Sequence, residues 1–344
     1  MANVYRADQV GSLIAPVPAT IASGAAAGDA IKALLTMQKQ CGLDVFSDGE
    51  LPRTSPCAIF AGNVAGVRSD SDAKTKSSPY VSGPLERTAR LTATEVDLLE
   101  RTAPGAFKIT LPSPTVAAMQ MFREGVTNAH YPTRRDLAQA LAAIIRREVE
   151  DLLADGVPYI QLNCPAYEIA SDRAGAATLG SPEEMLRLDS EALRDLRKSE
   201  KSTLAVHLPR PRDANGAPAS VATAAEKRAG ILESIIARTP ADRILIEFHQ
   251  PAESDFVPLR TVPAGKMAVL GLVDPLAPRA DDVDPLLDQL DLAVTFIGAE
   301  RLALSPQRGF AEPGAASDAK AFEAQRRSLT LTVEAARRFW GFEM

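Results

Sequence analysis

The sequence predicts an α/β protein built as a TIM (β/α)8 barrel. Along the 344 residues, a short apolar segment, a turn rich in Gly, Pro or Asp and a helical stretch follow one another eight times. With 46% hydrophobic residues, the chain can bury the core of such a barrel. The first strand-to-helix turn lacks a G-x-G-x-x-G motif, which disfavours an open dinucleotide-binding sheet. We therefore expect residues 1–344 to form one barrel domain.

The predicted strands are short apolar segments that end in polar or turn residues. Parallel strands covered on both faces have this composition, because neither side of the sheet meets water. In chain order they are residues 4–13, 43–47, 107–111, 159–162, 204–210, 243–248, 266–273 and 301–304.

The predicted helices repeat apolar residues at intervals of three or four. Residues 134–154 carry a long stripe of this kind, and Gly156 follows it as a stop signal. Ser181 before Pro182 is typical of a helix start. The other predicted helices are residues 28–41, 93–102, 182–199, 221–238, 254–260, 281–296 and 317–339. Residues 51–105 are irregular, and we interpret them as an insertion after the second strand.

Composition excludes several functional classes. The net charge of −6 argues against a general nucleic-acid binder. The three cysteines (Cys41, Cys57 and Cys164) have no paired spacing, which suits a reducing compartment. An apolar run of about 18 residues is absent, and so is a secretory signal. We expect a cytoplasmic protein, without membrane or nucleic-acid partners, that acts on a small molecule; a homo-oligomer remains open.

Polar residues recur where the predicted strands end. In a barrel of parallel strands, chemistry is done at that end, so these side chains are expected to converge on one site. The alternative is that these residues share no site and are polar only because strand ends lead into loops, which are polar in any protein. The residues are Ser12, Asp48, Glu50, Asn163, Cys164, His207, Glu247, His249, Asp274, Gln307 and Arg308.

A metal site is one interpretation of this set. His207 lies near the end of the fifth predicted strand, while Glu247 and His249 are two residues apart on the next one and face the same way. Two histidines and a carboxylate suit zinc with an open position, or iron. The alternatives are that His207 is a satisfied core histidine and that His249 lies beyond the barrel rim.

Other residues have paired interpretations as well. Cys164 is either a nucleophile or a buried spectator thiol. Glu50 is a general base, a ligand for a cationic amine, or a solvated turn carboxylate. Arg308 either binds a carboxylate or phosphate or forms a surface salt bridge. His130 and Tyr131 are favoured as surface residues over lid residues.

Taken together, the strand ends resemble the catalytic C-terminal barrel of cobalamin-independent methionine synthase and its single-domain relatives. The likeness covers nearly the whole chain. The matching segments are 10–13, 42–45 with 48–50, 111–114, 159–162, 207–210, 247, 256–260, 269–272 and 304–310.

The resemblance implies a zinc enzyme that moves a methyl group from a methyl-folate, or a corrinoid in some relatives, to a thiol. His207 and Glu247 match two of the family's zinc ligands. Pro209 and Arg308 stand where the family has two cysteine ligands. Asn163 replaces the acidic residue that holds the substrate amino group, whereas Glu50 and Ser12 match other substrate contacts. From the same segments we predict substrate contacts at Gly11, Ser12, Asp48, Asn163 and Gln307.

Three hypotheses follow. The first is a group-transfer enzyme acting on a small substrate other than homocysteine, with any metal held by His207 and Glu247 together with His249 or Cys164. The second is a metal-free lyase or hydrolase that uses Glu50 or His207 in acid/base catalysis and Arg308 as an anion clamp. The third is a binding protein without activity. We favour the first, because the site has gained polar residues rather than lost them.

Overall fold

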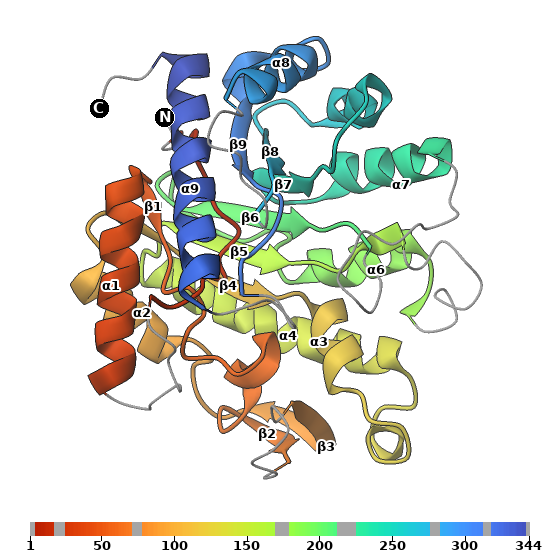
Figure 1. Cartoon of the computed structure of the whole chain (residues 1–344). Helices are drawn as coiled ribbons and strands as arrows, with labels where there is room; N and C mark the ends of the chain where they lie inside the picture. The colour runs from red at the N-terminus through yellow and green to blue at the C-terminus, as the bar shows by residue number, and fades with distance from the viewer. Residues whose placement is uncertain are drawn as a thin grey trace.

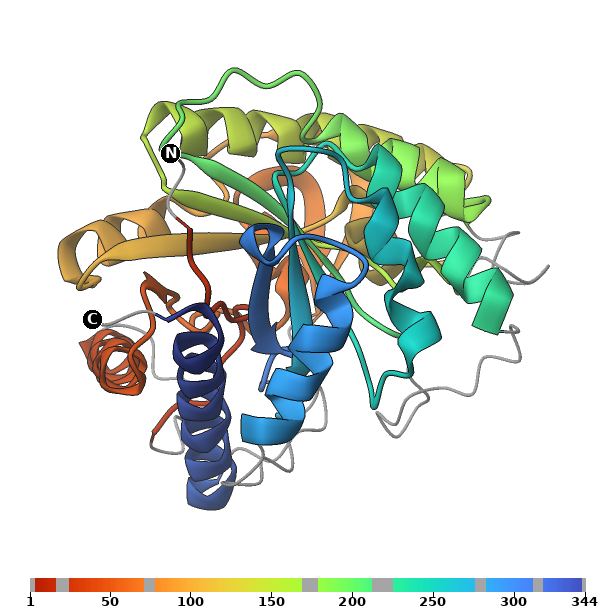
Figure 2. The same cartoon turned by 90° about the horizontal axis from the view of Figure 1, so that it is seen from above.

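The computed structural model describes residues 4–16, 25–70, 78–168, 179–211, 225–275, 283–311 and 318–341. Its main sheet has seven parallel strands in the order β1-β4-β5-β6-β7-β8-β9. The sheet curls, and helices surround it (Figure 1 and Figure 2). The strands are β1 Val45–Phe46, β4 Ala106–Pro112, β5 Tyr159–Asn163, β6 Thr203–Leu208, β7 Arg243–Glu247, β8 Met267–Val273 and β9 Leu302–Pro306. The predicted α/β barrel class is confirmed.

The first predicted strand, residues 4–13, is corrected by the structure. This segment forms only one isolated parallel bridge, between Ala7 and Leu304 of β9. On its other side it reaches the end of β1 through Leu13, whose backbone N–H donates to the Gly49 carbonyl at 2.9 Å. Gly11 has a φ of +136°, which breaks an extended strand. The segment thus lies between β9 and β1 without forming an eighth strand.

Side chains of the sheet divide between a lumen and an outer layer, because successive residues of a strand point to opposite faces. Eight buried apolar residues of the described chain form a cluster in the lumen, among them Tyr159, Ala205 and Leu245. Their sequence neighbours, such as Ile160 and Val206, belong to the larger cluster under the helices. This alternation decides which polar residues can meet inside the barrel.

The helices agree with the sequence predictions, with four corrections. They are α1 Ala25–Cys41, α2 Ala93–Thr102, α3 Pro114–Met121, α4 Arg134–Ala154, α6 Pro182–Glu191, α7 Ala225–Arg238, α8 Val283–Val294 and α9 Ala319–Trp340, with a 3-10 helix, η4, at Glu253–Thr261. The expected starts at residues 221, 281 and 317 lie outside the described residues.

Each correction has a local cause. Helix α6 ends at Glu191 rather than near 199, and a turn follows in which Asp195 has a φ of 56°. Helix α8 ends at Val294 rather than near 296 and is followed by a tight turn, in which Thr295 donates its backbone N–H to Leu292. Helix α3 was not predicted; Ser113 caps it, and Pro114 opens it. Trp340 belongs to α9, which stops where Gly341 adopts a left-handed conformation.

Residues 51–105 hold a 3-10 helix, an antiparallel hairpin and α2. The hairpin pairs β2 Val64–Ser69 with β3 Pro79–Arg87, outside the barrel sheet. The backbone N–H of Leu85 donates to the Tyr131 hydroxyl at 2.9 Å, so Tyr131 anchors the hairpin, while His130 is exposed. Of the described helices, none is long and apolar enough to cross a membrane.

Candidate functional site

Asn163 and His207 meet at the C-terminal mouth of the barrel. They are register partners on β5 and β6, so their side chains lie on the same face of the sheet. His207 follows Ala205 by two residues, and Ala205 is a lumen residue. By the same alternation, Glu247 follows the lumen residue Leu245 on β7. Three of the polar residues predicted to converge therefore face the same end of the lumen.

Glu50 adds a carboxylate to this mouth. Its Oε1 accepts a hydrogen bond from the Thr110 hydroxyl at 2.6 Å and a longer one from Asn163 Nδ2 at 3.5 Å. Glu50 has a φ of 57°, a left-handed conformation that is strained for a residue with a side chain. A Cβ at Gly11 would come within 2.6 Å of Thr110 Cγ2, so only glycine lets the chain pass this closely.

Asp48 supports Glu50 from below, since its Oδ1 accepts the Glu50 backbone N–H at 2.9 Å. Its Oδ2 is buried and has no hydrogen-bond partner among the described residues. Burial, and then the negative charge of Glu95, raise the pKa of Asp48 to about 7. The positive charge of Arg53 acts in the opposite direction but is outweighed. Arg53 forms two hydrogen bonds with Glu95, at 2.8 and 2.6 Å, and donates to the Thr110 carbonyl.

A second buried network lies deeper in the lumen. Lys108 of β4 donates to Asp8 Oδ1 at 2.7 Å, to the Gln9 carbonyl and to Gln161 Oε1 at 2.9 Å. Burial lowers the pKa of Lys108 to about 8. Burial alone would raise the pKa of Asp8, but the charges of Lys108 and Arg243 lower it. Gln161 connects this network to Asn163.

Ser12, Gln307 and Arg308 lie where the N-terminal segment meets the end of β9. The Phe310 N–H donates to the Ser12 carbonyl at 2.9 Å, and a Cβ at Gly309 would stand 2.0 Å from Ser12 Oγ. Gln307 donates its amide to the Leu272 carbonyl at 3.4 Å. Arg308 is 8% exposed, so its guanidinium is no surface salt-bridge group.

The three predicted metal ligands lie at or near the ends of β6 and β7. Within the described part of the chain, no group of three or more His, Cys, Asp or Glu side chains could hold a metal ion. Glu247 Oε2 accepts the Arg210 backbone N–H at 2.9 Å. His249 is half-buried and lies two residues past the end of β7, in agreement with the alternative that it lies beyond the barrel rim. Structural and catalytic zinc sites use Cys, His, Asp or Glu side chains, and neither Pro209 nor Arg308 supplies such a donor.

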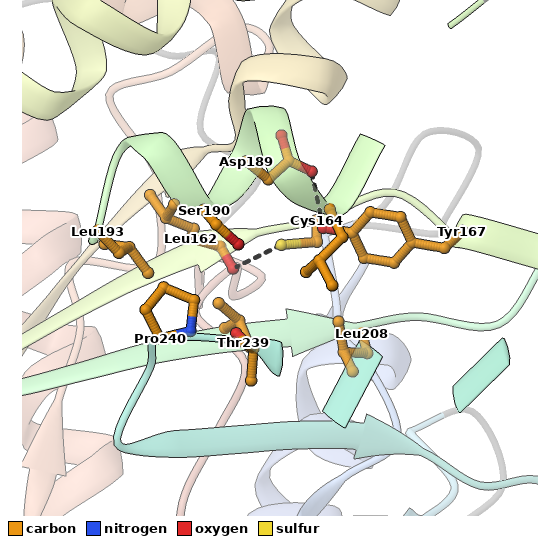
Figure 3. Close-up of a pocket in the computed structure, with 11 residues that line it drawn as sticks. Leu162, Cys164, Tyr167, Asp189, Ser190, Leu193, Leu208, Thr239 and Pro240 are labelled. Atoms are coloured by element: carbon orange, nitrogen blue, oxygen red, sulfur yellow. Dashed lines mark hydrogen bonds between the residues drawn. The ribbon is translucent and has the colours of Figure 1, made fainter. Parts of the chain in front are cut away.

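Cys164 lies apart from the mouth, so the structure does not place it with the residues expected to share its site. It follows Asn163 by one residue and points into the layer between the sheet and α6, beside Tyr167 and Asp189 (Figure 3). Its thiol is 3.9 Å from the Leu162 carbonyl. Burial and then the charge of Asp189 raise its pKa well above the usual value, which disfavours a reactive thiolate.

Sequence reasoning missed several residues that build the site. Thr110 and Lys108 lie on a strand that was correctly predicted, and a lysine inside an apolar strand was the available signal. Arg53 and Glu95 lie 42 residues apart in the insertion. Nothing in their local sequence indicates that they pair.

Comparison with known proteins identifies the family. Residues 19–194 match the family described as cobalamin-independent synthase, catalytic domain. This chain belongs to that family. Protein YxjH of Bacillus subtilis is 26% identical over 337 residues, covering 89% of this chain and 87% of that protein. A methionine synthase of Pyrococcus abyssi is 23% identical over 287 residues, covering 82% and 75%.

A solved structure of the family supports the fold. It is the B12-independent methionine synthase of Shewanella sp. W3-18-1 in complex with selenomethionine, with a TM-score of 0.73. The two chains are 20% identical, and the match covers 98% of each. Membership of the cobalamin-independent synthase family supports an enzyme of the methyl-transfer type that acts on a small molecule.

Proposed function

We propose that this chain transfers a methyl or other alkyl group to a small thiol-bearing acid and has diverged from methionine synthesis. The main support for this proposal is the conformation of Glu50, which has a φ of 57° and places its carboxylate beside Thr110 and Asn163. Strained backbone persists where the surroundings enforce it, and such positions cluster at active sites. A decayed site would have no reason to keep this conformation.

The proposed reaction needs a thiolate, a methyl donor and a place for one proton. His207 or Glu50 takes the proton of the substrate thiol. The sulfur then attacks the methyl carbon, so that an S–C bond forms and the donor's N–C bond (folate) or Co–C bond (corrinoid) breaks with its electron pair on the donor. With a folate donor, the proton held by the base goes to the departing nitrogen; with a corrinoid donor, it goes to solvent. The buried charge of Arg308 favours an anionic substrate group, in the position where the family has a cysteine ligand.

Two further features belong to this proposal. The three cysteines without paired spacing support a location in the cytoplasm. The relative from Shewanella was solved with selenomethionine, so methionine and its close analogues are suitable probes of the mouth.

The test is transfer of a labelled methyl group from methyl-folate or a methyl-corrinoid to a panel of small thiol acids. We expect a methylated thioether with the wild-type protein. Glu50→Gln should lower kcat/KM at least about tenfold, because it removes a charge from the reacting site.

The matched control is Glu86→Gln, at an exposed position of the hairpin, which should leave the rate unchanged. Absence of product with every donor would contradict the proposal, and so would full activity in Glu50→Gln. Breakdown of a thiol acid without any donor would instead support the lyase or hydrolase alternative.

A further inference from the structure

The amide of Gln161 is held in one orientation by two independent contacts. Lys108 has only donors, so the Gln161 oxygen must face it, and the two atoms are 2.9 Å apart. The Val10 carbonyl only accepts, so the Gln161 nitrogen must face it, at 2.6 Å. Both contacts give the same assignment, which removes the usual ambiguity between the oxygen and nitrogen of an amide.

The orientation of Gln161 sets that of Asn163. The second hydrogen of Gln161 Nε2 donates to Asn163 Oδ1 at 2.8 Å. The Asn163 oxygen therefore points down into the lumen, and its NH2 group points to the mouth. There Nδ2 lies 3.5 Å from Glu50 Oε1, which as a carboxylate only accepts. The chain of hydrogen bonds thus has a donor-only group at one end and an acceptor at the other.

Resting on the function proposed above, we propose that Asn163 determines substrate class: the substrate places an acceptor oxygen, not an ammonium group, against its NH2. An aspartate at this position would offer its second oxygen to an ammonium group. Asn163 offers N–H groups there instead, and they oppose a cationic donor. Lys108 and Gln161 are positioning residues, because they act through Asn163.

The choice between these ligand types can be measured with two matched compounds. L-methionine carries an ammonium group where its keto-acid analogue carries a carbonyl oxygen, and the rest of the two molecules is the same. Dissociation constants are measured by calorimetry on the full chain. We expect the wild-type protein to bind the keto acid at least about tenfold more tightly, and Asn163→Asp to reverse this preference.

Asn128→Asp is the matched control, because it adds the same charge at an exposed position. It should keep the wild-type preference. Tighter binding of methionine by the wild-type protein would overturn the inference and leave the proposed function standing. The inference also fails if Asn163→Asp leaves the ratio unchanged. If neither compound binds either protein, the inference fails, whereas the proposed function is decided by the methyl-transfer assay.

Gln161→Glu tests the positioning role without changing Asn163. The new carboxylate accepts a hydrogen bond from Lys108 and can only accept one from Asn163. Asn163 must therefore turn its NH2 group toward this carboxylate and its oxygen toward the mouth. The preference should then shift toward methionine, which a purely structural role of Gln161 would not produce. Thermal melting monitored by circular dichroism checks that the variant is folded. A folded variant with the wild-type ratio would contradict the positioning role.

Discussion

Asp48 and Asp189 are both buried carboxyl groups with raised pKa values, but their surroundings differ. Asp189 accepts hydrogen bonds from the Thr115 N–H at 2.8 Å, the Thr115 hydroxyl at 2.6 Å and the Tyr167 hydroxyl at 2.7 Å. Asp48 accepts one from Glu50 and leaves Oδ2 without a partner among the described residues. The ionised form is therefore supported at Asp189 and poorly supported at Asp48.

Asp48→Asn should stabilise the protein in a pH-dependent way. The pKa of Asp48 rises from 3.8 to about 7 on folding, so between these pH values the folded state holds a proton that the unfolded chain has lost. Stability from this group is present below about pH 4 and is lost as the pH rises through about 7. We expect the variant to gain about 1–3 kcal/mol in the free energy of unfolding at about pH 8 and little at about pH 4.

Urea denaturation at both pH values measures this effect. Asp189→Asn is the contrasting variant, because its amide would turn an NH2 group toward existing donors. It should lose about 1–3 kcal/mol. A loss of stability at about pH 8 in Asp48→Asn would refute this account of Asp48.

At the residue scale, the sequence predicted which polar residues end the strands but not how they are held. Glu50, Asn163 and His207 were found because strand ends converge in a barrel. The left-handed backbone of Glu50 was not predicted, because it depends on Asp48, Thr110 and the close passage of Gly11. The roles of Lys108 and Gln161 depend on Asp8 and Val10, which lie 100 and 151 residues away in the sequence.

At the element scale, helix α4 ties the insertion to the barrel. Glu148 of this helix is fully buried, and its carboxylate accepts from the Leu91 N–H at 2.8 Å, the Thr92 N–H at 3.0 Å and the Thr92 hydroxyl at 2.7 Å. Arg87, at the end of the hairpin, pairs with it at 2.6 Å. One carboxylate thus fixes the path from β3 to α2.

Glu148→Ala should lower the free energy of unfolding by about 3–5 kcal/mol, because it leaves two backbone N–H groups and one of the two paired nitrogens of Arg87 without their acceptor, while the other Arg87 nitrogen keeps Asp151. On the same helix, Arg147 is 64% exposed, with ion pairs of 3.5 and 3.7 Å. Arg147→Ala should change stability by less than about 1 kcal/mol. Chemical denaturation compares the two variants, and equal effects would argue against a fixing role for Glu148.

The ends of a helix were predicted correctly where neighbouring residues, such as a capping residue, determine them. The bounds of α4 were predicted to the residue, and Thr133 caps its start. Helix α6 was predicted too long, because its apolar spacing continues past the turn that ends it. Residues 4–13 looked like a strand by composition, but Gly11 and hydrogen bonds to two distant segments give them another path.

At the scale of the whole molecule, a repeating pattern of strands and helices was enough to predict the barrel. Seven parallel strands form the sheet, and the N-terminal segment lies between its edges. The predicted metal site depends on contacts between single side chains rather than on a repeating pattern. Three residues of the right type at strand ends favour a metal, but whether they meet depends on where β7 ends, and Glu247 is its last residue.

The central proposal is that this member of the cobalamin-independent synthase family holds no zinc at its mouth, because Pro209 and Arg308 stand where the resemblance implies cysteine ligands. Elemental mass spectrometry on the tag-free protein, beside His207→Ala, tests it most directly. We expect zinc and iron far below stoichiometric in both proteins, before and after incubation with either metal. About one zinc or iron per chain, lost in His207→Ala, would contradict the claim and restore His207, Glu247 and His249 as a metal set.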